Sequence, residues 1–154
     1  MKRRTKILIG ILILLILIQF IRPGRNNGDA LGRNDFTHEI PTSDTIMSIL
    51  KVSCFDCHSN HTNYPWYAEI APVSWWLNHH VNEGKQELNF TEFATYNARR
   101  KNKKLEEIAE QVKEHEMPLS SYTLIHTDAK LSEQQARALI QWTNTARQQI
   151  STVR

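Results

Sequence analysis

Two cysteines and a histidine stand close together in the segment CFDCH, from Cys54 to His58, and these are the only two cysteines of the chain. A CxxCH arrangement is typical of covalent haem attachment, in which two thiols add to the vinyl groups of the macrocycle and the histidine ligates the iron. Two intervening residues let both sulfurs reach one edge of the ring while the next residue lies under the metal. The sequence therefore predicts one haem c, tethered by Cys54 and Cys57 and held on one face by His58.

Other uses of paired cysteines remain open. A thioredoxin-like redox pair normally follows a strand in a βαβ unit, whereas this motif follows a helical pattern. A zinc site would need two further ligands, but the nearby histidines lack the usual spacing of a second ligand pair. These histidines are His58, His61, His79 and His80. A disulfide between the two cysteines would close a very short loop and would stabilise the fold little. Haem attachment is the favoured interpretation.

A six-coordinate haem needs a second axial ligand, usually a methionine sulfur or a histidine nitrogen. Met117 is the first candidate, because it lies in a loop 59 residues beyond His58, which leaves enough chain to wrap the ring. An isolated methionine more often fills core space, and His80 and then His126 are the rivals. A methionine ligand would raise the reduction potential above that of a bis-histidine haem, whereas an open sixth position would favour small-molecule binding or peroxide chemistry.

Helical patterns flank the motif, and no convincing strand pair is visible. Residues 42–53 predict a short amphipathic helix that leads into the cysteines, with Thr42 or Ser43 as its N-cap. A second helix is predicted from Pro72 to Glu83, where Gly84 would close it in left-handed geometry. His80 lies on the apolar face of this helix.

Two more helices are predicted after residue 90. A long polar helix, with Thr91 as a possible N-cap, runs toward Glu116 and is stopped by Met117 and Pro118. The last helix starts with a capping box formed by Ser132 and Gln135. We expect an all-α, cytochrome c-like domain in which the helix before the cysteines and the C-terminal helix pack together.

Aromatic residues are dense for so small a domain. Most are expected in the core, and some could line a haem pocket. They are Tyr64, Trp66, Tyr67, Trp75, Trp76 and Trp142. The His58 nitrogen that does not face the iron should donate to a carbonyl, for which the loop around Tyr64 and Pro65 is a candidate.

The N-terminus predicts a membrane anchor. Four basic residues lie within residues 1–6, and an apolar run follows from Ile7 to Ile21, which is the layout of a membrane-targeting segment. No small-residue cleavage pattern follows, and this favours an uncleaved anchor. We therefore expect residues 1–22 to form a single-pass transmembrane helix with its N-terminus in the cytoplasm, and residues 23–41 to form a flexible linker. Residues 42–150 would form the haem domain, in the periplasm or on the outer face of the membrane.

The net charge of +3 does not indicate a nucleic-acid partner. It arises from 19 basic and 16 acidic residues, and four of the basic ones lie in residues 1–6. The remainder, with 15 basic and 16 acidic residues, is nearly neutral. The basic run from Ala98 to Lys104 fits a solvated helix start. The expected partners are therefore the membrane and redox proteins of unknown identity.

The chain resembles the small bacterial haem-binding domain family, a relative of c-type cytochromes, from about Thr42 to Trp142. Four segments carry the resemblance, in order: CFDCHSN, NYPWYAEIAPVSWW, HVNEGKQELNFTEF and EMPLSSYTLIHTDAKLSEQQ. It implies a single haem at the CxxCH motif, with Met117 at the family's Met-Pro step and His126 in the same segment. Phe93 stands where the family more often has tryptophan.

The predicted function is that of a membrane-anchored monohaem c-type cytochrome, which transfers single electrons and is an electron carrier rather than a catalyst. Two alternatives stay open. One is a haem-based sensor or peroxidase-like enzyme with a labile sixth ligand, and the other is a zinc or thiol redox module. The resemblance supports haem as the cofactor far more strongly than it identifies a reaction.

Overall fold

The computed structural model describes residues 2–152, and within them the chain is all-helical, as predicted. The α-helices of this part are α1 (Arg3–Ile18), α2 (Asp44–Ser53), α3 (Phe55–His58), α4 (Val73–Glu87), α5 (Ala98–Lys113), α6 (Ser120–Thr123) and α7 (Glu133–Thr152). Short 3-10 helices join them, namely η1 (Phe36–His38), η2 (Trp66–Glu69), η3 (Phe90–Thr95) and η4 (Thr127–Ala129). The described residues form no strand, only an isolated bridge between Asn27 and His61.

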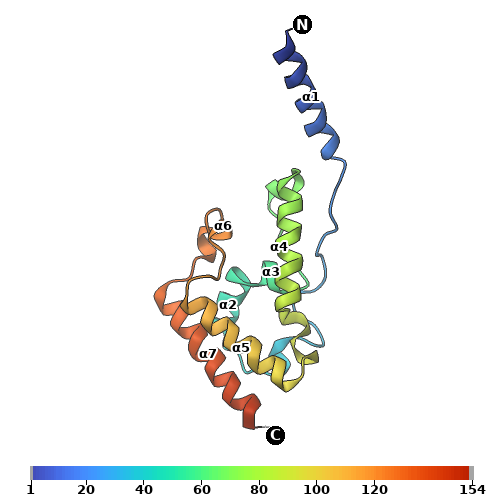
Figure 1. Cartoon of the computed structure of the whole chain (residues 1–154). Helices are drawn as coiled ribbons and strands as arrows, with labels where there is room; N and C mark the ends of the chain where they lie inside the picture. The colour runs from blue at the N-terminus through green and yellow to red at the C-terminus, as the bar shows by residue number, and fades with distance from the viewer. Residues whose placement is uncertain (1, 153–154) are drawn as a thin grey trace.

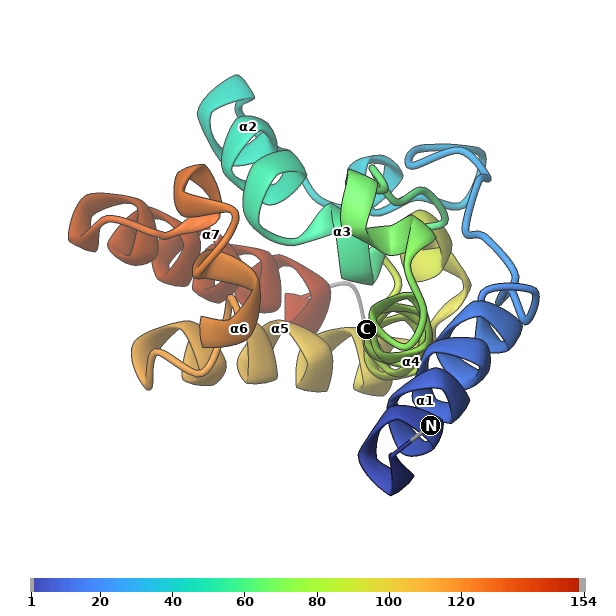
Figure 2. The same ribbon diagram turned by 90° about the horizontal axis from the view of Figure 1, so that it is seen from above.

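Helices α5 and α7 lie side by side and form the base of the domain, while α4 stands at an angle to them (Figures 1 and 2). Helix α2 packs against α7, so the predicted contact between the helix before the cysteines and the C-terminal helix is confirmed. Leu50 and Leu139 are fully buried between them. Trp142 lies in the same core, and its Nε1 donates to the Pro41 carbonyl at 3.2 Å.

Phenylalanines form the centre of the core. Phe36 packs edge-on against Phe55, Phe90 and Trp142, with ring centroids 5.2 to 6.2 Å apart. Phe93 is also fully buried. The core is therefore built around Phe36, which lies in the segment predicted as a flexible linker.

Much of that predicted linker packs against the domain. Ile40 is 2 % exposed and joins the core, and Glu39 pairs with the buried Lys101 of α5 at 2.9 Å. Further upstream, the Asn26 side chain donates to the Ser59 carbonyl at 2.9 Å, directly after the CxxCH motif. The Gly- and Asn-rich composition suggested flexibility, but the buried apolar side chains and these polar bonds hold residues 26–41 in place.

Local capping signals explain where several helices begin. Ser43 accepts from Ile46 N at the start of α2, and Ser132 and Gln135 form the predicted reciprocal capping box before α7. Thr91 is not the cap of the polar helix. Asn97 fills that position and accepts from Arg100 N at 2.9 Å. The Thr91 hydroxyl instead accepts a hydrogen bond from Asn60 N and donates one to the Ala30 carbonyl, because Thr91 is buried between these two segments.

Two predicted helix ends are wrong. Helix α4 continues past Gly84 to Glu87, and Gly84 is not left-handed, since no glycine of the described residues has a positive φ. Helix α5 ends at Lys113, before Glu116. His115, with φ of 60°, takes the left-handed position, and Glu116 N bonds back to Gln111 O at 2.9 Å. This is a Schellman motif, so the helix ends through local backbone geometry five residues before Pro118 is reached.

Helix α1 projects away from the domain (Figure 1), and none of its residues is buried. Its end is tied to the start of α4, because Trp75 Nε1 donates to the Ile21 carbonyl at 2.7 Å and the Gln19 amide exchanges two bonds with the Ala71 backbone. Among residues 2–152, no helix combines the length and apolarity needed to cross a membrane. The predicted transmembrane helix is therefore not found, because the helix covers only the 16 residues Arg3–Ile18.

Candidate haem site

The CxxCH segment forms one helical turn. Cys54 ends α2, and the carbonyl of Cys54 accepts from Cys57 N at 3.2 Å and from His58 N at 2.9 Å. Phe55, the first residue between the cysteines, is 4 % exposed and fixes the turn to the phenylalanine core. The motif is therefore held rigidly, and the helical turn sets the positions of the two cysteines and the histidine relative to one another.

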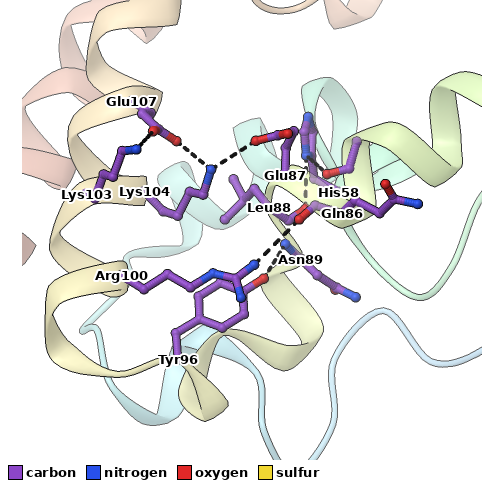
Figure 3. A network of polar contacts seen from close by, with 11 residues as sticks. His58, Gln86, Glu87, Leu88, Asn89, Tyr96, Arg100, Lys103, Lys104 and Glu107 are labelled. Carbon is purple, nitrogen blue, oxygen red and sulfur yellow. Dashed lines mark hydrogen bonds and ion pairs between the residues drawn. The ribbon is translucent and has the colours of Figure 1, made fainter.

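The His58 ring is oriented by two backbone carbonyls of α4 and the residue that follows it. Its Nδ1 lies 2.9 Å from Gly84 O and 3.0 Å from Leu88 O (Figure 3). This requires the ring proton on Nδ1 and leaves the lone pair on Nε2, as a metal-ligating imidazole needs. Burial lowers the pKa of His58, which favours the neutral, ligating form. The predicted carbonyl partner is thus present, but it comes from α4 and not from the loop around Tyr64 and Pro65.

Gly84 allows this arrangement. A Cβ at position 84 would lie 2.7 Å from the Cys57 carbonyl oxygen and 3.1 Å from Cys57 Cβ, well inside van der Waals contact. Only glycine lets α4 approach the CxxCH turn closely enough for the Gly84 carbonyl to reach His58. The sequence pointed to this position because Gly84 is the single glycine within the predicted domain of residues 42–150. Glycine is needed there for close packing and not for a helix cap.

A charged network holds the end of α4 against α5 (Figure 3). Lys104 Nζ lies 3.1 Å from a Glu87 oxygen and 2.6 Å from a Glu107 oxygen, with its side chain only 13 % exposed. Burial opposes the charge of Lys104, but the hydrogen bonds that Lys104 donates to Glu107 and Glu87 outweigh this effect and raise the pKa of Lys104. Glu87 immediately precedes Leu88, so this network stabilises one of the two carbonyls that orient His58.

Two adjoining cavities lie at the motif. The inner cavity, of about 380 Å³, reaches from Cys54 and His58 to an apolar wall on α5. The outer cavity, of about 270 Å³, reaches from Cys54 and Cys57 to α4 and α6. Both are lined by Ser53, Cys54, His58, Glu87, Met117 and Pro118. The volume of the inner cavity is typical of cofactor pockets, and the exposed surface of both cavities is mainly apolar although several lining residues are polar or charged.

The three candidates for the second iron ligand lie in different places. Met117 lines both cavities together with His58. His80 lines only the outer cavity of these two, and its ring packs on Trp76 with its Nδ1 3.0 Å from the Trp76 carbonyl. His126 lines neither, and its Nε2 lies 2.7 Å from the Tyr67 hydroxyl. The geometry thus favours Met117 over both histidines, and the ligand assignment stays a prediction.

The aromatic residues divide between core and site. Trp142 is in the core, whereas Trp66 and Trp76 are 77 % and 45 % exposed. Trp66, Tyr67 and Trp76 line a third cavity of about 250 Å³, which also contains Cys57 and His80. The expectation that most of the predicted aromatics are core residues is therefore wrong. The buried aromatics are mainly phenylalanines, which the sequence did not single out because they carry no polar signature.

The two thiols do not favour the alternative chemistries. Burial raises the pKa of Cys54 to about 12, and burial together with the Asp56 charge raises the pKa of Cys57 to about 11. A redox-active cysteine needs the opposite, a stabilised thiolate. In the described part of the chain, no three Cys, His, Asp or Glu side chains gather at a potential metal site. The zinc and thiol redox alternatives therefore have no support in the structure.

The residues at the site fit a haem. The site offers a neutral imidazole fixed through Nδ1 and two cysteines in the same turn, beside a cavity with a methionine in its wall, and these groups suit a c-type haem. No curated protein and no solved structure matches the chain. A family model described as a haem-binding domain matches residues 13–145, which include the whole site. The chain therefore belongs to the haem-binding domain family, and its cofactor is haem.

Proposed function

We propose that this protein is a monohaem c-type cytochrome that carries single electrons. The observation that carries the proposal is the orientation of His58 by the Gly84 and Leu88 carbonyls, in the same turn as Cys54 and Cys57. This arrangement fixes one ligand before any cofactor is present. The bound haem would supply a one-electron redox couple at its iron.

The two cysteines tether the cofactor in this proposal. Each thiol adds across one vinyl group, so that a carbon–sulfur bond forms and the thiol proton goes to the other vinyl carbon. No oxidant is consumed. Cys54 lines both cavities and Cys57 lines the outer one, so both cysteines border the same space. The tether would keep the haem in place in both oxidation states, which suits a carrier.

Met117 is the proposed second ligand. It shares both cavities with His58, and it follows directly after the His115 turn that redirects the chain at the end of α5. A thioether ligand favours ferrous iron and so raises the reduction potential. With both axial positions filled by side chains, the site would leave no open position for a substrate, which supports an electron carrier over a sensor or a peroxidase.

Membrane attachment through α1 is a further part of the proposal. Its support is the exposure of the large apolar side chains from Ile7 to Leu17, which ranges from 42 % at Ile9 to 66 % at Leu8. Basic residues stand at the N-terminal end of α1 and would face the cytoplasm. The haem domain would lie on the outer face of the cytoplasmic membrane, where c-type haem is attached and redox partner proteins could reach it. A C-terminal alkaline phosphatase fusion, active only outside the cytoplasm, tests this placement.

The electron-carrier function is tested by redox titration of the haem-loaded protein. We expect a reversible one-electron couple, a low-spin spectrum in both states and no rapid binding of carbon monoxide. Met117→Ala should lower the potential and open the ferrous iron to carbon monoxide, and His80→Ala is the matched control that should change neither. Rapid carbon monoxide binding by the unmodified protein would instead support the sensor or peroxidase-like alternative.

A further inference from the structure

One side-chain bond joins the segment that carries Met117 to the CxxCH turn. The Tyr122 hydroxyl of α6 donates to Asp56 Oδ2 at 2.7 Å, across 66 residues of sequence. Asp56 lies between the two cysteines, and Tyr122 lies five residues after Met117. Tyr122 also lines the outer cavity together with His58 and Met117.

Both partners of this bond are themselves fixed. The other carboxylate oxygen of Asp56 accepts from the backbone and side-chain nitrogens of Asn63, at 2.9 and 3.1 Å. The Tyr122 ring stacks on His126, with centroids 4.3 Å apart and an interplanar angle of 15°. His126 in turn bonds to the Tyr67 hydroxyl of η2. The bond therefore connects two ordered groups and does not depend on a freely rotating side chain.

Few apolar contacts hold the part of this segment from α6 onward. Helix α6 has no buried residue, and the two apolar residues that follow it, Leu124 and Ile125, are 80 % and 61 % exposed. Met117, Pro118 and Leu119 are half-buried, but apolar burial contributes little to the position of α6 and the residues that follow it, which polar side-chain contacts set instead. Among these contacts, the Tyr122–Asp56 bond is the one that reaches the cysteine turn.

We propose that Tyr122 is a positioning residue that holds Met117 at its distance from the iron by bonding to Asp56. The inference rests on the proposed role of Met117 as the second ligand. Because the bond ends inside the same turn that tethers the haem, it fixes the position of Met117 relative to the cofactor itself. Without it, the segment would open more often and the sulfur would leave the iron more easily.

Tyr122→Phe in the haem-loaded full-length protein tests the proposal, because it removes the hydroxyl and keeps the ring. Amide hydrogen exchange across residues 117–126 should become about tenfold faster, since a hydrogen bond to a carboxylate is lost. The methionine-to-iron charge-transfer band should weaken, the reduction potential should fall and carbon monoxide should bind faster. Tyr64→Phe is the matched control. It also removes a hydroxyl, which accepts a 2.7 Å bond from Asn26 N, but Tyr64 lies outside this segment and the change should leave all four measurements unchanged.

The outcomes separate this proposal from the ligand assignment. If Met117→Ala leaves the potential and the spectrum unchanged, Met117 is not a ligand, and the role of Tyr122 falls with it. If Met117→Ala lowers the potential but Tyr122→Phe leaves potential, spectrum and exchange as in the unmodified protein, only the positioning role is overturned. If the role is correct, adding Tyr122→Phe to Met117→Ala should speed exchange without lowering the potential further.

Discussion

The Nδ1 atom of His58 lies 2.9 Å from the carbonyl oxygen of Gly84, across 26 residues of sequence. This one bond links the two elements of the haem site, the CxxCH turn and helix α4. It exists because residue 84 has no side chain, so that α4 can pack directly on Cys57. The orientation of His58, the proposed iron ligand, thus depends on a glycine.

Gly84→Ala should therefore damage the site. The added Cβ would meet the Cys57 carbonyl, which is backbone and cannot swing away, so α4 must shift by a few tenths of an ångström or more. We expect a loss of about 1–3 kcal/mol in the free energy of unfolding, a cost typical of overpacking, and a lower yield of protein with bound haem. Chemical denaturation and the haem-to-protein absorbance ratio measure the two effects.

The control for this prediction is Gly24→Ala, because a Cβ at position 24 would have no atom within 4 Å. It should change neither stability nor haem yield. An equally stable Gly84→Ala variant with full haem occupancy would show that the close approach of α4 is not needed.

Lys104→Met should loosen the end of α4 while keeping the length of the side chain. The variant loses the bonds to Glu87 and Glu107, and it leaves the partly buried Glu107 carboxylate without this partner, whereas the Glu87 side chain is 77 % exposed. We expect about 1 kcal/mol of destabilisation in urea unfolding. Lys103→Met is the matched control, since its ion pair with Glu107 is 3.4 Å long and its side chain is 70 % exposed. Such a surface pair should contribute less than about 0.5 kcal/mol, and equal losses in both variants would contradict the account.

His115→Gly should stabilise the protein. His115 holds φ at 60°, a conformation that costs an ordinary residue about 1 kcal/mol and glycine almost nothing. We expect a gain of about 0.5–1 kcal/mol in thermal or urea unfolding, partly offset by the greater freedom of glycine in the unfolded chain. His115→Ala keeps the strain and removes only the imidazole. If this variant stabilised the protein as much as glycine does, the backbone explanation would be wrong.

Acid should remove the contribution that the Asp35 carboxylate makes to the stability of the fold. This carboxylate is 4 % exposed, and although burial opposes its charge, bonds from Thr37 and Gly32 N lower its pKa below the ordinary 3.8. Its contribution to stability is therefore complete above the unfolded-state pKa and is lost as the pH falls through the lower folded-state pKa. Urea unfolding between pH 7 and pH 3 should show a smaller acid-induced loss in Asp35→Asn than in the unmodified protein. Parallel curves would contradict this assignment.

Features set by near neighbours in sequence were predictable. The CxxCH turn, the Ser43 cap and the Ser132–Gln135 capping box all depend on residues within one helical turn, and the structure contains them. Met117 was also found from sequence as a residue near the site, because the chain length between it and His58 allows the chain to wrap the cofactor.

Features that depend on distant contacts were not predictable. The sequence suggested Gly84 as a helix cap. The structure shows instead that glycine is needed at position 84 because α4 packs directly on Cys57, which lies 27 positions earlier in the chain. Phe36 lay in a segment whose Gly- and Asn-rich composition suggested a tether, although its ring is central to the core. The Tyr122–Asp56 bond joins two polar residues with no shared pattern, so only the fold brings them together.

Covalent attachment of haem through Cys54 and Cys57 is the central claim, and a pyridine haemochrome spectrum tests it most directly. The protein would be expressed together with the c-type haem attachment machinery and washed under denaturing conditions that remove unbound haem. We predict that the haem stays with the protein and that its reduced α-band lies at the position of a haem with two thioether bonds. A Cys54→Ala/Cys57→Ala variant should lose the haem in the wash. A band at the position of haem b, or loss of all haem from the unmodified protein, would contradict the account.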